Sequence, residues 1–294
     1  MITNNYALLK SEKTKQIMQV ISEDLSAEYQ GLHRLLSSLH QDQWQIETGF
    51  KQWSIYDHCC HLCISDEMAL LATGSRVEFE AEMARRRKVR EQKQQFTPDW
   101  KNELIPLYGN YSAPQLIARW SEIRQQLLNR LKALAPKHRL PWHGPDMSAK
   151  SFATARLMET WAHGQSIYDS LNIIRKNSHR LKHICQLGYR TFGWSFSIHN
   201  LPIPDSTVSL NLSSPDGEHW HWGKTQNLET ISGSAEDFCL VVTQCRNFED
   251  TNLSIRGNFA QQWMEHAQCF AGGPAENPKR GERRRTKPLD QDKQ

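Results

Sequence analysis

The stretch WSIYDHCCHLCISDEMAL, residues 53–70, decides the fold because it shows how a helix begins and which chemistry that helix carries. Ser54 can cap the first turn, and Asp57 three residues later can bond back to the backbone in a capping box. The helix is expected to run through Leu70. Gly74 then predicts a break before a very polar segment at residues 82–95.

Three further long helices accompany this one. Over residues 20–40, apolar side chains recur at steps of three and four, which places them on one helical face. Ser112, with Gln115 at the capping-box position, begins a helix that ends at Pro136. A fourth helix is predicted over residues 148–171. Four helices separated by polar loops predict a four-helix bundle over residues 15–175.

The pattern changes after the bundle. A fifth helix is expected over residues 178–192, and period-two alternation at 207–212 and 219–222, around a Pro-Asp-Gly turn, predicts a β-hairpin. Two short helices should follow, at residues 234–241 and 259–270. Residues 176–271 are therefore predicted to form a small α+β domain, which makes the whole chain α+β in class.

The last segment, residues 272–294, combines Gly, Pro and charge with almost nothing apolar, which predicts a disordered basic tail. It holds seven basic and four acidic residues, whereas the whole chain of 294 residues carries a net charge of +4. The rest is therefore close to neutral, which argues against a large nucleic-acid footprint. The run Arg85-Arg86-Arg87-Lys88 is interpreted as a solvated helical face, with RNA or phosphate binding as the alternative.

Compartment and membrane association are constrained by the same sequence. Seven cysteines are an odd number, and no apolar stretch near Met1 could serve as a signal peptide, which favours a reduced, cytoplasmic protein. No run approaches the roughly 18 apolar residues of a membrane span, so no membrane partner is expected. A homo-oligomer is compatible with the sequence.

Two residues of the fourth helix carry the first sign of a metal site. Glu159 and His163 lie four residues apart, so both side chains project from one helical face. A carboxylate and an imidazole on one face can bind a divalent ion, although a plain surface pair has the same spacing. His58 and His61 in the helix that begins at residue 53 offer a further ligand, because facing helices of a bundle bring their ligands together in the core.

Other metal-like patterns are interpreted as structural. Cys60 and Cys63 have the C-x-x-C spacing, but no second pair completes a four-ligand zinc site, so buried thiols are expected there. His219 and His221 share one face of a strand without a carboxylate nearby. They are interpreted as surface residues.

A resemblance joins these features. The motif Trp53-Ser54-x-x-Asp57 leading to His61-Leu62, followed later by Glu159-x-x-x-His163, resembles the N-terminal metal-binding domain of the mycothiol-dependent maleylpyruvate isomerases. That family belongs to the DinB-like superfamily of four-helix-bundle metalloenzymes. The segment at residues 231–240, with Arg246 and Trp263, resembles the α+β tail domain of the same architecture. A related tail is similar to the C-terminal segment of tRNA wybutosine-synthesis proteins.

The resemblance implies a site and a reaction. The metal ligands would be His61, Glu159 and His163, with His58 outside the ligand set, and Arg246 would bind the substrate. The ion would be zinc first, or nickel, manganese or iron, and its partner a low-molecular-weight thiol: mycothiol, glutathione or bacillithiol. A metal-bound thiolate would add to a small electrophilic substrate, giving an isomerase or a transferase. The alternatives are a non-catalytic metal-binding bundle with a stress or sensor role, and a tRNA-associated protein.

Overall fold

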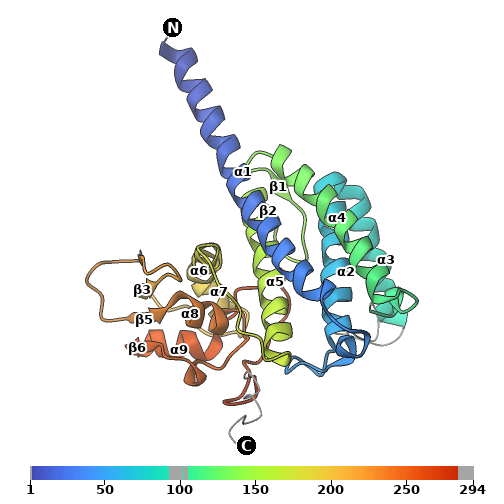
Figure 1. Ribbon diagram of the computed structural model, residues 1–294. Helices are drawn as coiled ribbons and strands as arrows, with labels where there is room; N and C mark the ends of the chain where they lie inside the picture. Colours follow the sequence, from blue (N-terminus) through green and yellow to red (C-terminus); the bar gives the residue numbers. More distant parts are fainter. Residues whose placement is uncertain (1, 93–100, 102–104, 284–294) are drawn as a thin grey trace, which may run out of the picture. The chain divides into compact units, whose positions relative to one another are not determined.

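The computed structural model describes residues 2–92, 101 and 105–283 (Figure 1). The described chain divides into two compact units. One contains the residues up to Glu47 together with Trp53–Thr160, and the other contains Thr48–Gln52 together with the chain from Trp161 onward. The division falls inside one continuous helix, so this helix contributes residues to both units.

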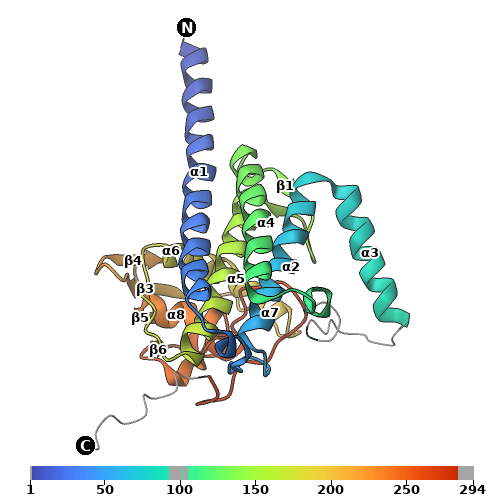
Figure 2. The same ribbon diagram turned by 45° about the vertical axis from the view of Figure 1, so that its right-hand side comes forward.

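The predicted bundle is present in the described residues. Its helices are α1 (Ile2–Ser37), α2 (Ile55–Gly74), α4 (Ala113–Ala133) and α5 (Ala149–Ser170). Helices α1 and α2 both pack against α4. The polar helix α3 (Arg76–Gln92) follows α2 after the predicted break, and two views show it leading away from the end of α2 (Figures 1 and 2). None of the described helices is long and apolar enough to cross a bilayer.

Short elements connect these helices. They are the 3-10 helices η1 (Gln41–Gln45) and η3 (Ile105–Tyr108) and a two-stranded antiparallel pair, β1 (Arg139–Leu140) with β2 (Met147–Ser148).

Helix α1 begins well before the predicted start at residue 20. Figure 2 shows its N-terminal part extending beyond the neighbouring bundle helices. Residues 2–19 contain neither Pro nor Gly, which would break a helix, and include good helix formers such as Lys and Leu, so a helix can form there without an apolar stripe. The apolar periodicity that located the helix marks only the part that packs in the bundle.

Capping side chains fix where two bundle helices begin. The Ser54 hydroxyl accepts a hydrogen bond from the Asp57 amide at 3.1 Å, and the Asp57 carboxylate accepts one from the Ser54 amide at 2.9 Å. Ser112 and Gln115 form the same reciprocal pair at the start of α4. Both predicted capping boxes are confirmed.

A single buried carboxylate connects all four bundle helices. Asp66 of α2 has no exposed surface, and it accepts hydrogen bonds from the Tyr29 hydroxyl of α1 at 2.9 Å and the Trp120 indole of α4 at 2.8 Å. The guanidinium Nε of Arg156, on α5, donates to it at 2.8 Å. A buried ion pair with further hydrogen bonds of this kind fixes the register of the helices that supply it.

The second unit contains a four-stranded sheet in the order β4-β3-β5-β6. Its strands are β3 (Ser209–Ser213), β4 (His219–Trp222), β5 (Thr230–Ser234) and β6 (Ser254–Arg256). Strands β3 and β4 pair antiparallel with Leu212 opposite Trp220, which confirms the predicted hairpin. Strand β5 runs parallel to β3, and β6 runs antiparallel to β5.

Four helices in the described part of this unit accompany the sheet: α6 (Leu181–Arg190), α7 (Phe192–Ser197), α8 (Ala235–Val242) and α9 (Asn258–His266). The single helix predicted over residues 178–192 is two, separated at Thr191. Gly188 permits the close approach of α6 and α8, because a Cβ there would lie 3.0 Å from the side chains of Phe238 and Val242. The unit's core includes the fully buried Leu210 and Ile231.

Strands β5 and β6 were not predicted. Strand β5 reads Thr-Ile-Ser-Gly-Ser, with one large apolar side chain, and β6 has three residues, so neither carries a period-two signal. Backbone hydrogen bonds to a neighbouring strand therefore stabilise them: β5 pairs with β3, and β6 pairs with β5.

Residues 272–283 differ from the predicted disordered tail. The Asn247 side-chain amide donates to the Pro278 carbonyl at 2.8 Å, and the Gln244 amide donates to the Ala275 carbonyl at 3.1 Å. Polar side chains of the domain therefore bind the backbone of this segment, an effect that composition alone cannot reveal. The remaining residues of the tail lie outside the described part.

Candidate metal centre

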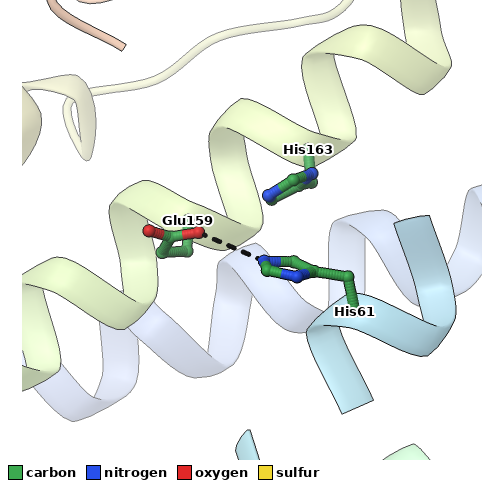
Figure 3. A group of neighbouring side chains, drawn as sticks. All are labelled: His61, Glu159 and His163. Carbon is green, nitrogen blue, oxygen red and sulfur yellow. Dashed lines mark ion pairs between the residues drawn. The ribbon is translucent and has the colours of Figure 1, made fainter. Parts of the chain in front are cut away.

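Three side chains predicted to bind a metal lie together. Glu159 and His163 project from successive turns of α5, and His61 faces them from α2 (Figure 3). One ligand atom from each residue lies within 4.8 Å of the others, and His61 Nε2 is 3.6 Å from Glu159 Oε2. The two histidines are buried and Glu159 is half-buried.

The donor set fits a divalent ion. Two imidazoles and a carboxylate match the three protein ligands of catalytic zinc sites, which leave a fourth position open. Bond lengths of about 2.0–2.2 Å separate neighbouring ligand atoms in a tetrahedral site by about 3.4 Å. The 3.6 Å between His61 and Glu159 is close to this value.

Aromatic neighbours hold both imidazoles. The Trp53 ring lies 5.3 Å from that of His61, centroid to centroid. In the second unit, the rings of Phe50 and His163 make an edge-to-face contact, with centroids 5.4 Å apart and an angle of 80° between the ring planes. These contacts restrict the orientations of the rings, which favours a preorganised ligand set.

His58 is not part of this cluster. It is fully buried on α2, with its ring 5.4 Å from that of Trp53. The structure brings His61, Glu159 and His163 together, and His58 lies outside this cluster.

The cysteines of α2 are buried free thiols, as predicted. Burial raises the pKa of Cys63 to about 12 and the pKa of Cys60 well above its ordinary value. A thiol held in its protonated form is a poor metal ligand.

Arg246, the predicted substrate-binding residue, is held in an ion pair. Its Nη2 lies 2.6 Å from Asp169 Oδ2, and its Nη1 donates to the Cys245 carbonyl at 2.7 Å. Gln165 also donates to Asp169, at 3.0 Å. The charge of Arg246 is therefore compensated within the second unit.

The remaining candidates occupy ordinary structural positions. His221 is exposed on β4, where its ring shares hydrogen bonds with the Asn211 side chain and the Gly223 carbonyl. Arg85 and Arg86 both pair with Glu82 on the same helix, α3. Arg85, Arg87 and Lys88 are exposed, as expected for a solvated helical face, whereas Arg86 is buried.

Sequence reasoning missed several residues near these groups. Arg156 lies three residues before Glu159 and forms a buried ion pair with Asp66. No spacing in the sequence predicts this pair. The Phe50 ring contacts His163, and Lys51 and Arg283 both lie over the Phe50 ring. Arg283 belongs to the segment that the sequence predicts to be disordered. Only the tertiary fold brings them together.

Comparisons with known proteins bear on this arrangement. A family model described as the mycothiol maleylpyruvate isomerase N-terminal domain matches residues 25–168, which include the three clustered residues. Two uncharacterized proteins of Mycobacterium tuberculosis, from strains CDC 1551 and H37Rv, are each 37% identical to this chain over 251 residues. The match spans 85% of this chain and 95% of either relative.

Solved structures show the same fold. Two crystal structures of the mycothiol-dependent maleylpyruvate isomerase, one of them of a histidine-to-alanine mutant, superpose with a TM-score of 0.51. They cover 76% of this chain and 88% of the solved chain, with 13% and 12% sequence identity.

Proposed function

Because this chain belongs to the family of the mycothiol maleylpyruvate isomerase N-terminal domain, we propose that it is a divalent-metal-dependent enzyme using a low-molecular-weight thiol. In this proposal the thiol sulfur adds to an electrophilic carbon of a small substrate. The protein is an isomerase if the thiol leaves again and a transferase if it stays. The observation that carries the proposal is the convergence of His61, Glu159 and His163 from two bundle helices.

The residues of the chain have separate roles in this proposal. His61, Glu159 and His163 would hold the ion, which when bound supplies the positive charge that favours an ionised thiol beside it. Trp53 keeps the His61 ring in a binding orientation. Glu159 balances part of the ion's charge and is the more exposed of the three, which leaves it reachable by solvent and small molecules.

We propose the ion only as a divalent metal and the thiol only as a low-molecular-weight thiol. Imidazole and carboxylate ligands suit zinc first, and also nickel, iron or manganese. Mycothiol is the thiol named in the family's description, and glutathione and bacillithiol offer the same sulfur chemistry. The seven reduced cysteines fit a reducing compartment, which supports a cytoplasmic location.

Arg246 is proposed as a substrate-binding residue by the family resemblance. Its ion pair with Asp169 means that a substrate carboxylate would have to share the guanidinium with an existing partner. The similarity of the tail to wybutosine-synthesis proteins, the tRNA alternative and the non-catalytic bundle all stay predictions. A ligand set with an open fourth position favours the enzyme over a purely structural ion.

Metal content tests the proposal. Protein purified without a His tag should carry about one divalent ion per chain by plasma mass spectrometry, because the cluster offers one three-ligand site. His61→Ala and His163→Ala should each lose it. The exposed His138→Ala serves as the matched control and should retain the ion. Stoichiometric metal in both His61→Ala and His163→Ala would refute the proposed site.

A further inference from the structure

A strained loop lies against His163. Lys51 and Gln52, neither of them glycine, are in the left-handed backbone region with φ of 51° and 57°. Consecutive residues of this kind cost free energy and persist where the surrounding structure requires them, often at binding sites. The loop places the Phe50 ring against the imidazole of His163.

Two cations lie over that aromatic ring. The Arg283 guanidinium carbon lies 4.8 Å from the Phe50 centroid, and Lys51 Nζ lies 5.4 Å from it. Arg283 also donates through Nη1 to the Gln244 carbonyl. Its Nε is buried and has no hydrogen-bond partner among the residues that the structure describes.

No carboxylate in the described part of the chain lies within ion-pair distance of either cation. Asp169 is engaged by Arg246, and Glu282 accepts a hydrogen bond from the Lys279 amide at 2.7 Å. Burial lowers the pKa of Arg283, and the charge of the neighbouring Glu282 acts in the opposite direction. Burial also lowers the pKa of Lys51, and the charge of Arg283 lowers it further. Two neighbouring cations without an ion-pair partner in the described residues are unfavourable, and a bound anion would relieve that cost.

We propose that Lys51 and Arg283, held on the Phe50 ring, form an anion subsite beside His163 that binds a carboxylate of the small molecules on which the protein acts. The proposal rests on the proposed function, which supplies both candidate sources of the carboxylate: the electrophilic substrate and a carboxylate-bearing thiol. The unused Arg283 Nε, together with a terminal nitrogen, gives the two parallel donors that a carboxylate accepts. Lys51 adds a point charge.

The subsite adds two residues to Arg246 as candidates for carboxylate recognition. Arg246 already has a carboxylate partner in Asp169, whereas Lys51 and Arg283 have none in the described residues. Replacing Arg246 would leave the Asp169 carboxylate without its counter-charge, so this replacement should mainly lower the free energy of unfolding. Removing Arg283 should act first on binding.

Isothermal titration with maleate, a small unreactive dicarboxylate, tests the subsite. The titration is made on chelator-treated and on zinc-loaded protein, so that anion binding is measured apart from metal content. Arg283→Gln should weaken maleate binding about tenfold or more, as expected for a lost charge-assisted pair. Lys51→Gln should weaken it less, and Arg283→Lys should keep part of the affinity. The exposed Arg280→Gln, three residues away, is the matched control and should bind as the wild type does.

A parallel titration with glutathione identifies the source of the carboxylate. Loss of maleate binding in Arg283→Gln assigns the subsite to the substrate, and loss of glutathione binding alone assigns it to the thiol. Unchanged affinity for both probes in Arg283→Gln, with only a lower melting temperature, would show a structural cation and overturn the proposal. Failure of metal binding with intact anion binding would instead count against the proposed function.

Discussion

Cys63 shows how one residue type changes its chemistry with its position. Burial raises the pKa of its thiol to about 12, above the roughly 8.5 of an exposed cysteine. Ellman's reagent at pH 8 should therefore leave Cys60 and Cys63 unmodified in the native protein, whereas protein unfolded in urea, the control, should react at all seven cysteines. Rapid native labelling of Cys63 would contradict this.

The same shift gives a dependence of stability on pH. An acid whose pKa is higher in the folded state than in the unfolded state stabilises the fold fully below its unfolded value. That contribution declines as the pH rises from about 8.5 toward 12. The urea midpoint should accordingly fall over this range, and Cys63→Ala should show a smaller fall than the wild type does.

The residues of the candidate metal site were predictable one by one, and their neighbours were not. Glu159 and His163 follow from a four-residue spacing, and His61 from the family motif on a facing helix. Arg283 had no such signal, because the composition around it predicts disorder and only contacts with Phe50 and Gln244 order it. Spacing within a helix can be read from the sequence, but contacts between distant segments cannot.

At the scale of elements, the start of α2 depends on one hydroxyl. Ser54→Ala removes the acceptor for the Asp57 amide and should lower the free energy of unfolding by about 1 kcal/mol. Ser54→Thr keeps a hydroxyl and should recover most of the loss. Urea denaturation followed by circular dichroism measures both. An alanine variant as stable as the wild type would mean that water replaces the cap without cost.

Elements with strong local signals were predicted, and those that depend on a partner strand were missed. Capping boxes at Ser54 and Ser112 and the alternation of β3 and β4 are local features. Strand β5 exists because its backbone bonds to β3 on one side and to β6 on the other. Its Gly233 and serines would favour a loop in isolation.

At the scale of the whole bundle, Asp66 is important for stability because its carboxylate bonds to side chains of the three other helices. Asp66→Asn keeps the size but removes the charge that Arg156 faces, leaving a buried guanidinium without its counter-ion. Burial lowers the pKa of Arg156, and the charge of Asp66 raises it. Because a guanidinium stays protonated in proteins, a buried cation remains when the carboxylate is lost.

Breaking a buried pair of this kind costs about 3–5 kcal/mol, which the urea unfolding of Asp66→Asn should show. The exposed Asp42→Asn, in the same unit, is the control and should stay within about 0.5 kcal/mol of the wild type. A loss below about 1 kcal/mol in Asp66→Asn would show that water or a rearranged Arg156 replaces the pair.

The position of Lys51 and Arg283 over one aromatic ring has a consequence for folding during synthesis. A ribosome completes residue 51 more than two hundred residues before residue 283, and the earlier bundle helices can begin to fold in that interval. A product terminated before Arg283 would contain all three candidate metal ligands but only one of the two cations. The cluster around Phe50 thus forms only after residue 283 has been synthesised.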